Sequence, residues 1–187
     1  MKNYLIILAL LTILFSACKE KKEVKQEPPI SALSIIKGQI KKLDSSMYAF
    51  TRYDKTDLKS DTTYLQREEV SKHAEPFLTL SDIADKKNYE KYTEEKLIDA
   101  QTDKLSIIST LKENENSEVL KQIMIIDVAD VSSAKVESIY IDRNITSKDS
   151  IIEQKLFWQI DKFFTINTAI IKENQPDKTH FIKVAWQ

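Results

Sequence analysis

Apolar residues recur from Leu33 onward with alternating spacings of three and four positions. They are Leu33, Ile36, Ile40, Leu43, Met47 and Phe50. This spacing places one apolar stripe along an α-helix, and the stripe is too short for a coiled-coil seam. Gly38 falls on the opposite face, where it costs roughly 1 kcal/mol relative to alanine. The pattern predicts an amphipathic helix that packs on a sheet.

The segment after this helix is polar, and a second helix is predicted beyond it. The polar composition of residues 54–63 predicts a loop. Thr63 and Gln66 have the spacing of a capping box, which would open a helix that Pro76 ends. Between residues 77 and 99 only short helical turns are expected.

After residue 100 the hydrophobic period changes to two, which is typical of strands. The predicted strands are 105–111, 119–128, 136–141, 151–160, 164–170 and 180–186. A single strand from residue 151 to 171 would be far longer than usual, so a tight turn is expected at Asp161-Lys162. The connections are too short for parallel neighbours, which predicts antiparallel pairing.

These elements predict one α+β domain over residues 30–187. Two or three N-terminal helices would pack on one face of a five- or six-stranded antiparallel meander sheet. Trp158 and Trp186 lie on predicted strands and are the only tryptophans. Because tryptophan buries a large apolar area, both are expected in the core.

The N-terminus has the order of a secretory signal peptide. Met1-Lys2-Asn3 is basic, Leu5 to Phe15 is apolar apart from Thr12, and small residues follow. The apolar run is too short for a transmembrane helix, which needs about 20 residues. Phe15-Ser16-Ala17-Cys18 resembles the lipobox of bacterial lipoproteins, which implies that Cys18 is lipidated and becomes the first mature residue. Residues 1–17 would then be the signal peptide, and residues 18–29 the lipidated cysteine and a charged tether.

Three strand segments resemble those of uncharacterised Gram-negative envelope lipoproteins. They are Ser138-Ile139-Tyr140-Ile141, Gln154-Lys155-Leu156-Phe157-Trp158 and Lys183-Val184-Ala185-Trp186. The resemblance implies that the protein is located in the cell envelope. A lipid anchor in the outer membrane is favoured over one in the inner membrane. The resemblance implies no enzymatic reaction for this chain.

Composition excludes several function classes. The 28 basic and 29 acidic residues are nearly balanced, which argues against a nucleic-acid partner. The single glycine leaves no phosphate-binding loop, and Cys18 as the only cysteine leaves no disulfide or Cys-x-x-Cys site. Two histidines without an HExxH pair give no histidine-rich metal site. No metal and no cofactor are expected, and the chain is not expected to be an enzyme.

Three residues are candidates for acid–base groups. Asp127 and Asp130 flank the end of a predicted strand, where aspartates usually bond to their own backbone in turns. His180 begins the last strand and would need a partner distant in the sequence to act as a base. Turn and solvent roles are favoured for all three.

Two functions of different classes follow. The first is a membrane-anchored structural or interaction module whose partner is an unknown envelope protein. The second is a carrier that holds a lipid or other apolar ligand between sheet and helices, against Trp158, Trp186, Ile40 and Met47. Lipoprotein-sorting carriers with half-open barrels are an analogy at the level of the fold, which does not establish function. A closed core would favour the module, and an apolar pocket of about 300–1,000 Å³ would favour the carrier.

Overall fold

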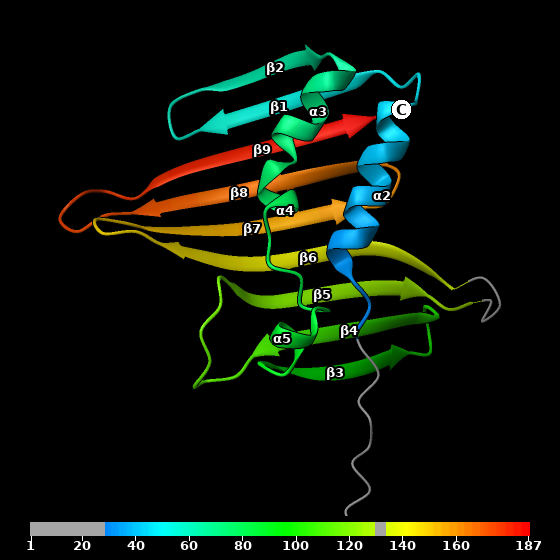
Figure 1. Cartoon of the computed structure of the whole chain (residues 1–187). Coiled ribbons are helices and arrows are strands. Elements are labelled where there is room, and N and C mark those ends of the chain that lie inside the picture. Colours follow the sequence, from blue (N-terminus) through cyan, green and yellow to red (C-terminus); the bar gives the residue numbers. More distant parts are fainter. Residues whose placement is uncertain (1–28, 130–133) are drawn as a thin grey trace, which may run out of the picture.

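A computed structural model of the chain describes residues 29–129 and 134–187. Nine strands form one sheet in the order β2-β1-β9-β8-β7-β6-β5-β4-β3, and every neighbouring pair is antiparallel. The helices lie across one face of this sheet (Figure 1). The last strand returns to pair with the first, so the hairpin β1–β2 continues the meander β3–β9.

The bounds of the elements are as follows. The helices are α2 (Ala32–Asp44), α3 (Arg67–His73), α4 (Glu75–Leu78) and α5 (Lys86–Tyr89). The strands are β1 (Phe50–Thr56), β2 (Ser60–Leu65), β3 (Tyr92–Asp99), β4 (Lys104–Leu111), β5 (Val119–Asp127), β6 (Lys135–Thr146), β7 (Ile151–Gln159), β8 (Phe163–Ile171) and β9 (Lys178–Trp186).

The predicted fold class is wrong. We expected an α+β domain with two or three helices on five or six strands, whereas nine strands dominate and the helices of the described residues are short. The six segments predicted as strands after residue 100 do form β4–β9. The three missed strands are β1, β2 and β3, which lie in segments expected to be a loop, the ends of the two predicted helices, or short turns. Their polar side chains point to both faces, so the apolar period of two does not appear in the sequence.

The first helix is shorter than its apolar stripe predicted. Ser31 caps the N-terminus of α2 by accepting a hydrogen bond from the Ser34 N–H at 2.9 Å. The helix ends at Asp44, so Met47 lies beyond it and is 99% exposed. Phe50 is the first residue of β1 and is buried. The prediction that Met47 and Phe50 belong to the helical stripe is therefore wrong, because the helix ends before either residue and Phe50 begins β1.

The second predicted helix exists, but its cap and its end differ from the prediction. The capping box joins Gln66 and Glu69, with the Gln66 N–H donating to Glu69 Oε2 at 2.8 Å. Thr63 belongs to β2 instead. Pro76 lies in the first turn of α4, where a missing N–H costs little, so it begins a helical turn.

The tight turn predicted at Asp161-Lys162 is confirmed by the hairpin between β7 and β8. Asp161 has a φ of 60°, a conformation that aspartate tolerates better than most residues. The turn is also tied to α2, because Lys42 Nζ donates to Asp161 Oδ1 at 2.7 Å and the Asp161 N–H donates to Gln39 Oε1 at 3.0 Å. The Lys42 hydrogen bond is the main reason that the pKa of Asp161 lies below its ordinary value.

The hydrophobic core lies between the helices and the sheet. Phe77 of α4 meets Trp158 of β7 edge to face, with ring centroids 5.1 Å apart. Trp158 stacks on Phe164 of β8 at 4.9 Å. All three side chains are fully buried, so the two layers are joined by direct aromatic packing.

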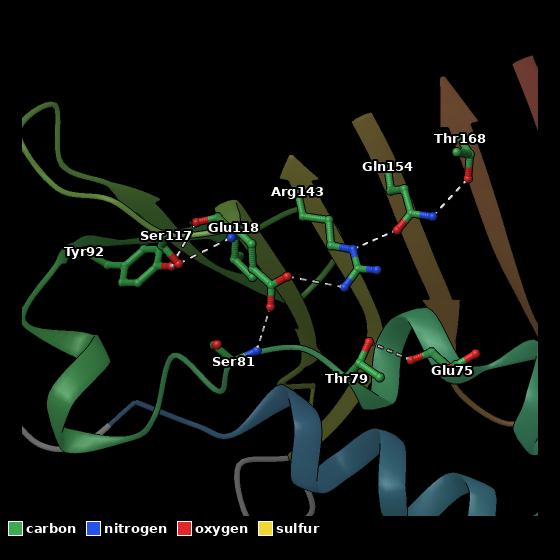
Figure 2. A network of polar contacts seen from close by, with 10 residues as sticks. Glu75, Thr79, Ser81, Tyr92, Ser117, Glu118, Arg143, Gln154 and Thr168 are labelled. Carbon is green, nitrogen blue, oxygen red and sulfur yellow. Dashed lines mark hydrogen bonds and ion pairs between the residues drawn. The ribbon is translucent and has the colours of Figure 1, made fainter. Parts of the chain in front are cut away.

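A polar network continues the core along the same face (Figure 2). Arg143 of β6 is 5% exposed, and its Nε donates to Gln154 Oε1 at 2.8 Å. Gln154 then donates to Thr168 Oγ1 at 3.1 Å. Glu118 pairs with Arg143 Nη1 at 3.7 Å and accepts the Ser81 N–H at 3.1 Å. These contacts link three neighbouring strands to the segment after α4, which is typical of a structural network.

Candidate functional site

The sequence named four residues for an apolar pocket, and the structure brings three of them together. Trp158, Trp186 and Ile40 belong to one core cluster, and the two indole rings lie 5.9 Å apart. Met47 lies apart from them and lines a surface hollow of about 390 Å³ between the α2–β1 connection and the end of β2. The ring contacts of Trp158 with Phe77 and Phe164 fill the space between sheet and helices at this point.

Both tryptophans leave a polar group unpaired. Within residues 29–129 and 134–187, the buried Nε1 atoms of Trp158 and Trp186 have no hydrogen-bond partner. An unsatisfied buried donor costs about 1–3 kcal/mol. The free energy gained by packing the two indole rings therefore outweighs the cost of leaving their N–H donors unpaired.

The candidate acid–base residues have structural partners where they are described. Asp127 Oδ2 accepts a hydrogen bond from Lys104 Nζ at 2.8 Å, and Asp127 Oδ1 accepts the Ala129 N–H at 3.1 Å. These hydrogen bonds, led by that of Lys104, lower the pKa of Asp127. Asp130 lies outside the described residues.

His180 has a partner that the sequence did not reveal. Its Nε2 lies 2.8 Å from Asp54 Oδ1, and Asp54 also accepts a hydrogen bond from Arg52. Burial alone would raise the pKa of Asp54, but the hydrogen bonds from His180 and Arg52 outweigh it and hold this pKa below its ordinary value. The cluster ties β1 to β9 across 126 residues of sequence. Only the pairing of the first strand with the last could have identified it.

No metal centre is found in the part of the chain that the structure describes, where no group of three or more His, Cys, Asp or Glu side chains could hold an ion. The described helices are also not long and apolar enough to cross a membrane. Cys18, the predicted lipidation residue, lies outside the described residues.

The face of the sheet opposite the helices carries a row of apolar side chains. The register pairs Ile108 with Ile123, Ile123 with Tyr140, and Tyr140 with Phe157, so the row crosses β4, β5, β6 and β7. All four side chains are half-buried. They have the opposite parity to the core residues of the same strands, and the described helices lie on the other face (Figure 1). We call this surface the helix-free face.

The apolar row extends toward β8 and β9. Phe157 and Phe163 have ring centroids 5.8 Å apart, and Lys183 Nζ lies 4.4 Å from the Phe163 centroid. The lysine also lies 6.0 Å from the ring of Tyr53 on β1. A cation at these distances from aromatic rings is held in place over an apolar surface.

A hollow lies at the β1–β2 end of the helix-free face. It has a volume of about 510 Å³, and its lining includes Tyr53, Tyr64, Thr51 and Ala185. The register places these four side chains on the same face, since Thr51 pairs with both Tyr64 and Ala185. Tyr64 is 83% exposed. We call this feature the tyrosine hollow. No pattern in the sequence pointed to this hollow, because both tyrosines lie in strands that were not predicted.

No protein family model, no curated protein and no solved structure matches this chain.

Proposed function

We propose that this chain is a membrane-anchored envelope lipoprotein that works as an interaction module and binds a protein partner on its helix-free face. The anchor is Cys18, and the partner presents apolar side chains to the row on β4–β7. The observation that carries the proposal is the half-buried row Ile108, Ile123, Tyr140 and Phe157 on a face that the described helices leave open.

The chemistry of the helix-free face supports a protein partner. Contiguous exposed apolar surface on a folded protein is typical of an interaction site. Aromatic residues such as Tyr140 and Phe157 are enriched in the buried centres of protein interfaces, where they carry much of the binding energy. Lysines beside the row, such as Lys183, provide a polar rim.

The packing of the opposite face favours a module over a carrier of apolar ligands. A carrier of the predicted kind needs open volume between the sheet and the helices, and the rings of Phe77, Trp158 and Phe164 are in contact there. The hollow of ligand size near Tyr53 and Tyr64 opens on the other side of the sheet.

The anchor is tested by fractionation of cells that express the full chain. A single acyl chain binds a membrane only marginally, whereas two or more make attachment stable. We expect the wild-type chain in the membrane fraction and Cys18→Ala in the soluble fraction or as an uncleaved precursor. A wild-type chain that is soluble, and whose size does not change when lipoprotein processing is inhibited, would refute the anchor.

The binding face is tested by photo-cross-linking of the full chain in its native envelope. A photoreactive residue at Phe157 should give a discrete protein adduct, and the same residue at Lys37, an exposed position on α2, should not. The adduct should disappear when Ile123→Asp is added to the Phe157 probe. Equal adducts from both positions, or none from Phe157, would contradict the proposal. An adduct of twice the chain mass would assign the face to self-association.

A further inference from the structure

The two edges of the sheet differ in how well they are protected against pairing with another strand. The edge strand β3 carries Glu94, Glu95 and Lys96 in its centre, and charged residues, lysine above all, discourage edge pairing. The edge strand β2 has the sequence Ser60-Asp61-Thr62-Thr63-Tyr64-Leu65, with one charged residue, no proline, and no bulge against β1. Residues 60–64 are all exposed. Strand β2 is therefore an open edge.

The register shows which backbone groups of β2 are free to pair. The Thr56 N–H donates to the Lys59 carbonyl at 2.8 Å, which makes these two residues a hydrogen-bonded pair of the hairpin. Hydrogen-bonded and non-hydrogen-bonded pairs alternate along an antiparallel ladder. The backbone N–H and C=O groups of Ser60, Thr62 and Tyr64 consequently point away from β1.

We propose that β2 pairs antiparallel with β2 of a second copy of this chain, on a two-fold axis at Thr62. This register places Ser60 opposite Tyr64 of the second copy, and Thr62 opposite its equivalent. Each of these pairs can exchange both backbone hydrogen bonds, and a Thr–Thr pair is favourable across antiparallel strands. The two sheets become one continuous sheet.

Neighbouring registers are poorer. An axis one residue earlier would place Asp61 opposite Asp61 of the second copy, and like charges directly opposite are destabilising. An axis one residue later would place Ser60 opposite Gln66, which caps α3 and lies beyond the strand. The register at Thr62 avoids both problems.

The proposed pairing also gives a partner to two exposed side chains. Leu58, in the β1–β2 turn, is 98% exposed, and Tyr64 is 83% exposed. With the axis at Thr62, Tyr64 lies diagonal to Leu58 of the second copy, a separation within reach of an aromatic side chain. The tyrosine hollow of each copy then lies beside the junction.

One local contact must be exchanged when the strands pair. Asp61 Oδ1 accepts the Thr62 N–H at 2.8 Å in the single chain. This bond satisfies the central donor of the edge and has to open in each copy. A six-residue edge is also smaller than a standard stable interface, so we expect a weak, reversible dimer. The inference does not depend on the anchor or on the helix-free face.

Disulfide cross-linking of the full chain in membranes tests the register. Directly opposed, hydrogen-bonded residues have Cα atoms about 5.5 Å apart, within the range of a disulfide. Under mild oxidation Thr62→Cys should form a covalent dimer in excess of wild type. Thr63→Cys, which would lie opposite Asp61, and Lys96→Cys on the other edge should not. Equal dimer from all three variants, or no excess from Thr62→Cys, would overturn the proposal. A disulfide dimer of wild type through Cys18 would count against the lipid anchor, and not against the pairing.

Sedimentation of the detergent-solubilised full chain tests the same edge without a cross-link. Thr62→Pro removes an outward N–H, and proline is tolerated in edge strands at such positions. We expect this variant to be monomeric at concentrations where wild type dimerises. The matched control Lys96→Pro on β3 should behave like wild type, because the Lys91–Lys112 backbone bond places the Lys96 N–H outward as well. Should Thr62→Pro unfold by circular dichroism, Tyr64→Lys takes its place. A folded Thr62→Pro or Tyr64→Lys that associates like wild type would refute the pairing.

Discussion

The two faces of the sheet are built from the same strands but are completed differently. On β7, Trp158 is fully buried beneath Phe77 of α4, whereas its sequence neighbour Phe157 is half-buried on the helix-free face. Both are large aromatic residues. The difference shows that an apolar residue in a strand does not by itself indicate core: the helices decide which face becomes the interior, and the apolar residues of the other face stay half-buried.

The largest expected effect comes from placing a charge on each face. Ile40 is buried in the core cluster, so Ile40→Asp would place a carboxylate there without a counter-ion, and the domain should not fold. Ile123→Asp is the matched change on the helix-free face, where water reaches the side chain, and it should fold. Circular dichroism melts of the two variants measure this. If Ile40→Asp folds and binds fatty-acid probes less tightly than wild type, the carrier function is the better one.

Truncation of the two neighbouring aromatics sharpens the comparison. Trp158→Ala should lower the free energy of unfolding by about 3–5 kcal/mol, since it removes a large buried ring. Phe157→Ala should cost only about 1 kcal/mol, because the side chain already keeps part of its surface in water. Urea titrations give both values. Similar losses for the two variants would mean that the helix-free face is as well covered as the core.

The pH dependence of stability is a smaller effect, and it reports on the helix-covered face (Figure 1). Burial, and then the positive charge of Arg52, lower the pKa of His73 on α3, while Glu69 and Asp54 oppose the shift. A histidine whose folded pKa is lowered binds fewer protons in the folded state than in the unfolded state. Stability should therefore fall as the pH drops below about 6.5, the ordinary value.

The variant His73→Gln should remove this decrease below about pH 6.5. The contribution of Asp54, whose pKa is also lowered, is lost only at lower pH, below its ordinary value of about 3.9. Thermal melts across this range provide the measurement. An unchanged slope in His73→Gln would assign the pH dependence to other groups.

The smallest expected effect concerns Gly38, on the exposed side of α2. A Cβ atom at this position would meet no atom within 4 Å. Gly38→Ala should therefore raise the free energy of unfolding by about 0.5–1 kcal/mol through helix propensity alone. Because the position touches neither face of the sheet, the change should leave cross-linking from Phe157 unaltered. Destabilisation by Gly38→Ala would indicate a contact on the outer side of α2.

Local pattern determined much of the fold. The period of two after residue 100 was sufficient for β4–β9, and the length limit on strands was sufficient for the turn at Asp161. The buried positions Ile36, Ile40 and Leu43 of α2 also follow from helical spacing. In α2 the apolar residues follow the helical period. In the strands, alternation or, over residues 119–128, an apolar run on both faces indicates the element.

Tertiary structure alone decided the remaining third of the sheet, strands β1, β2 and β3. Asp54 and Arg52 make β1 look like a polar loop, and it becomes a strand because β9 pairs with it and brings His180 to Asp54. The tyrosine hollow and the open edge of β2 arise from the same pairing. A contact between residues 126 positions apart leaves no periodic signal in either segment, so no local pattern could have predicted it. The sequence alone specified which residues prefer burial, and the placement of the helices decided which face of the sheet remains available for binding.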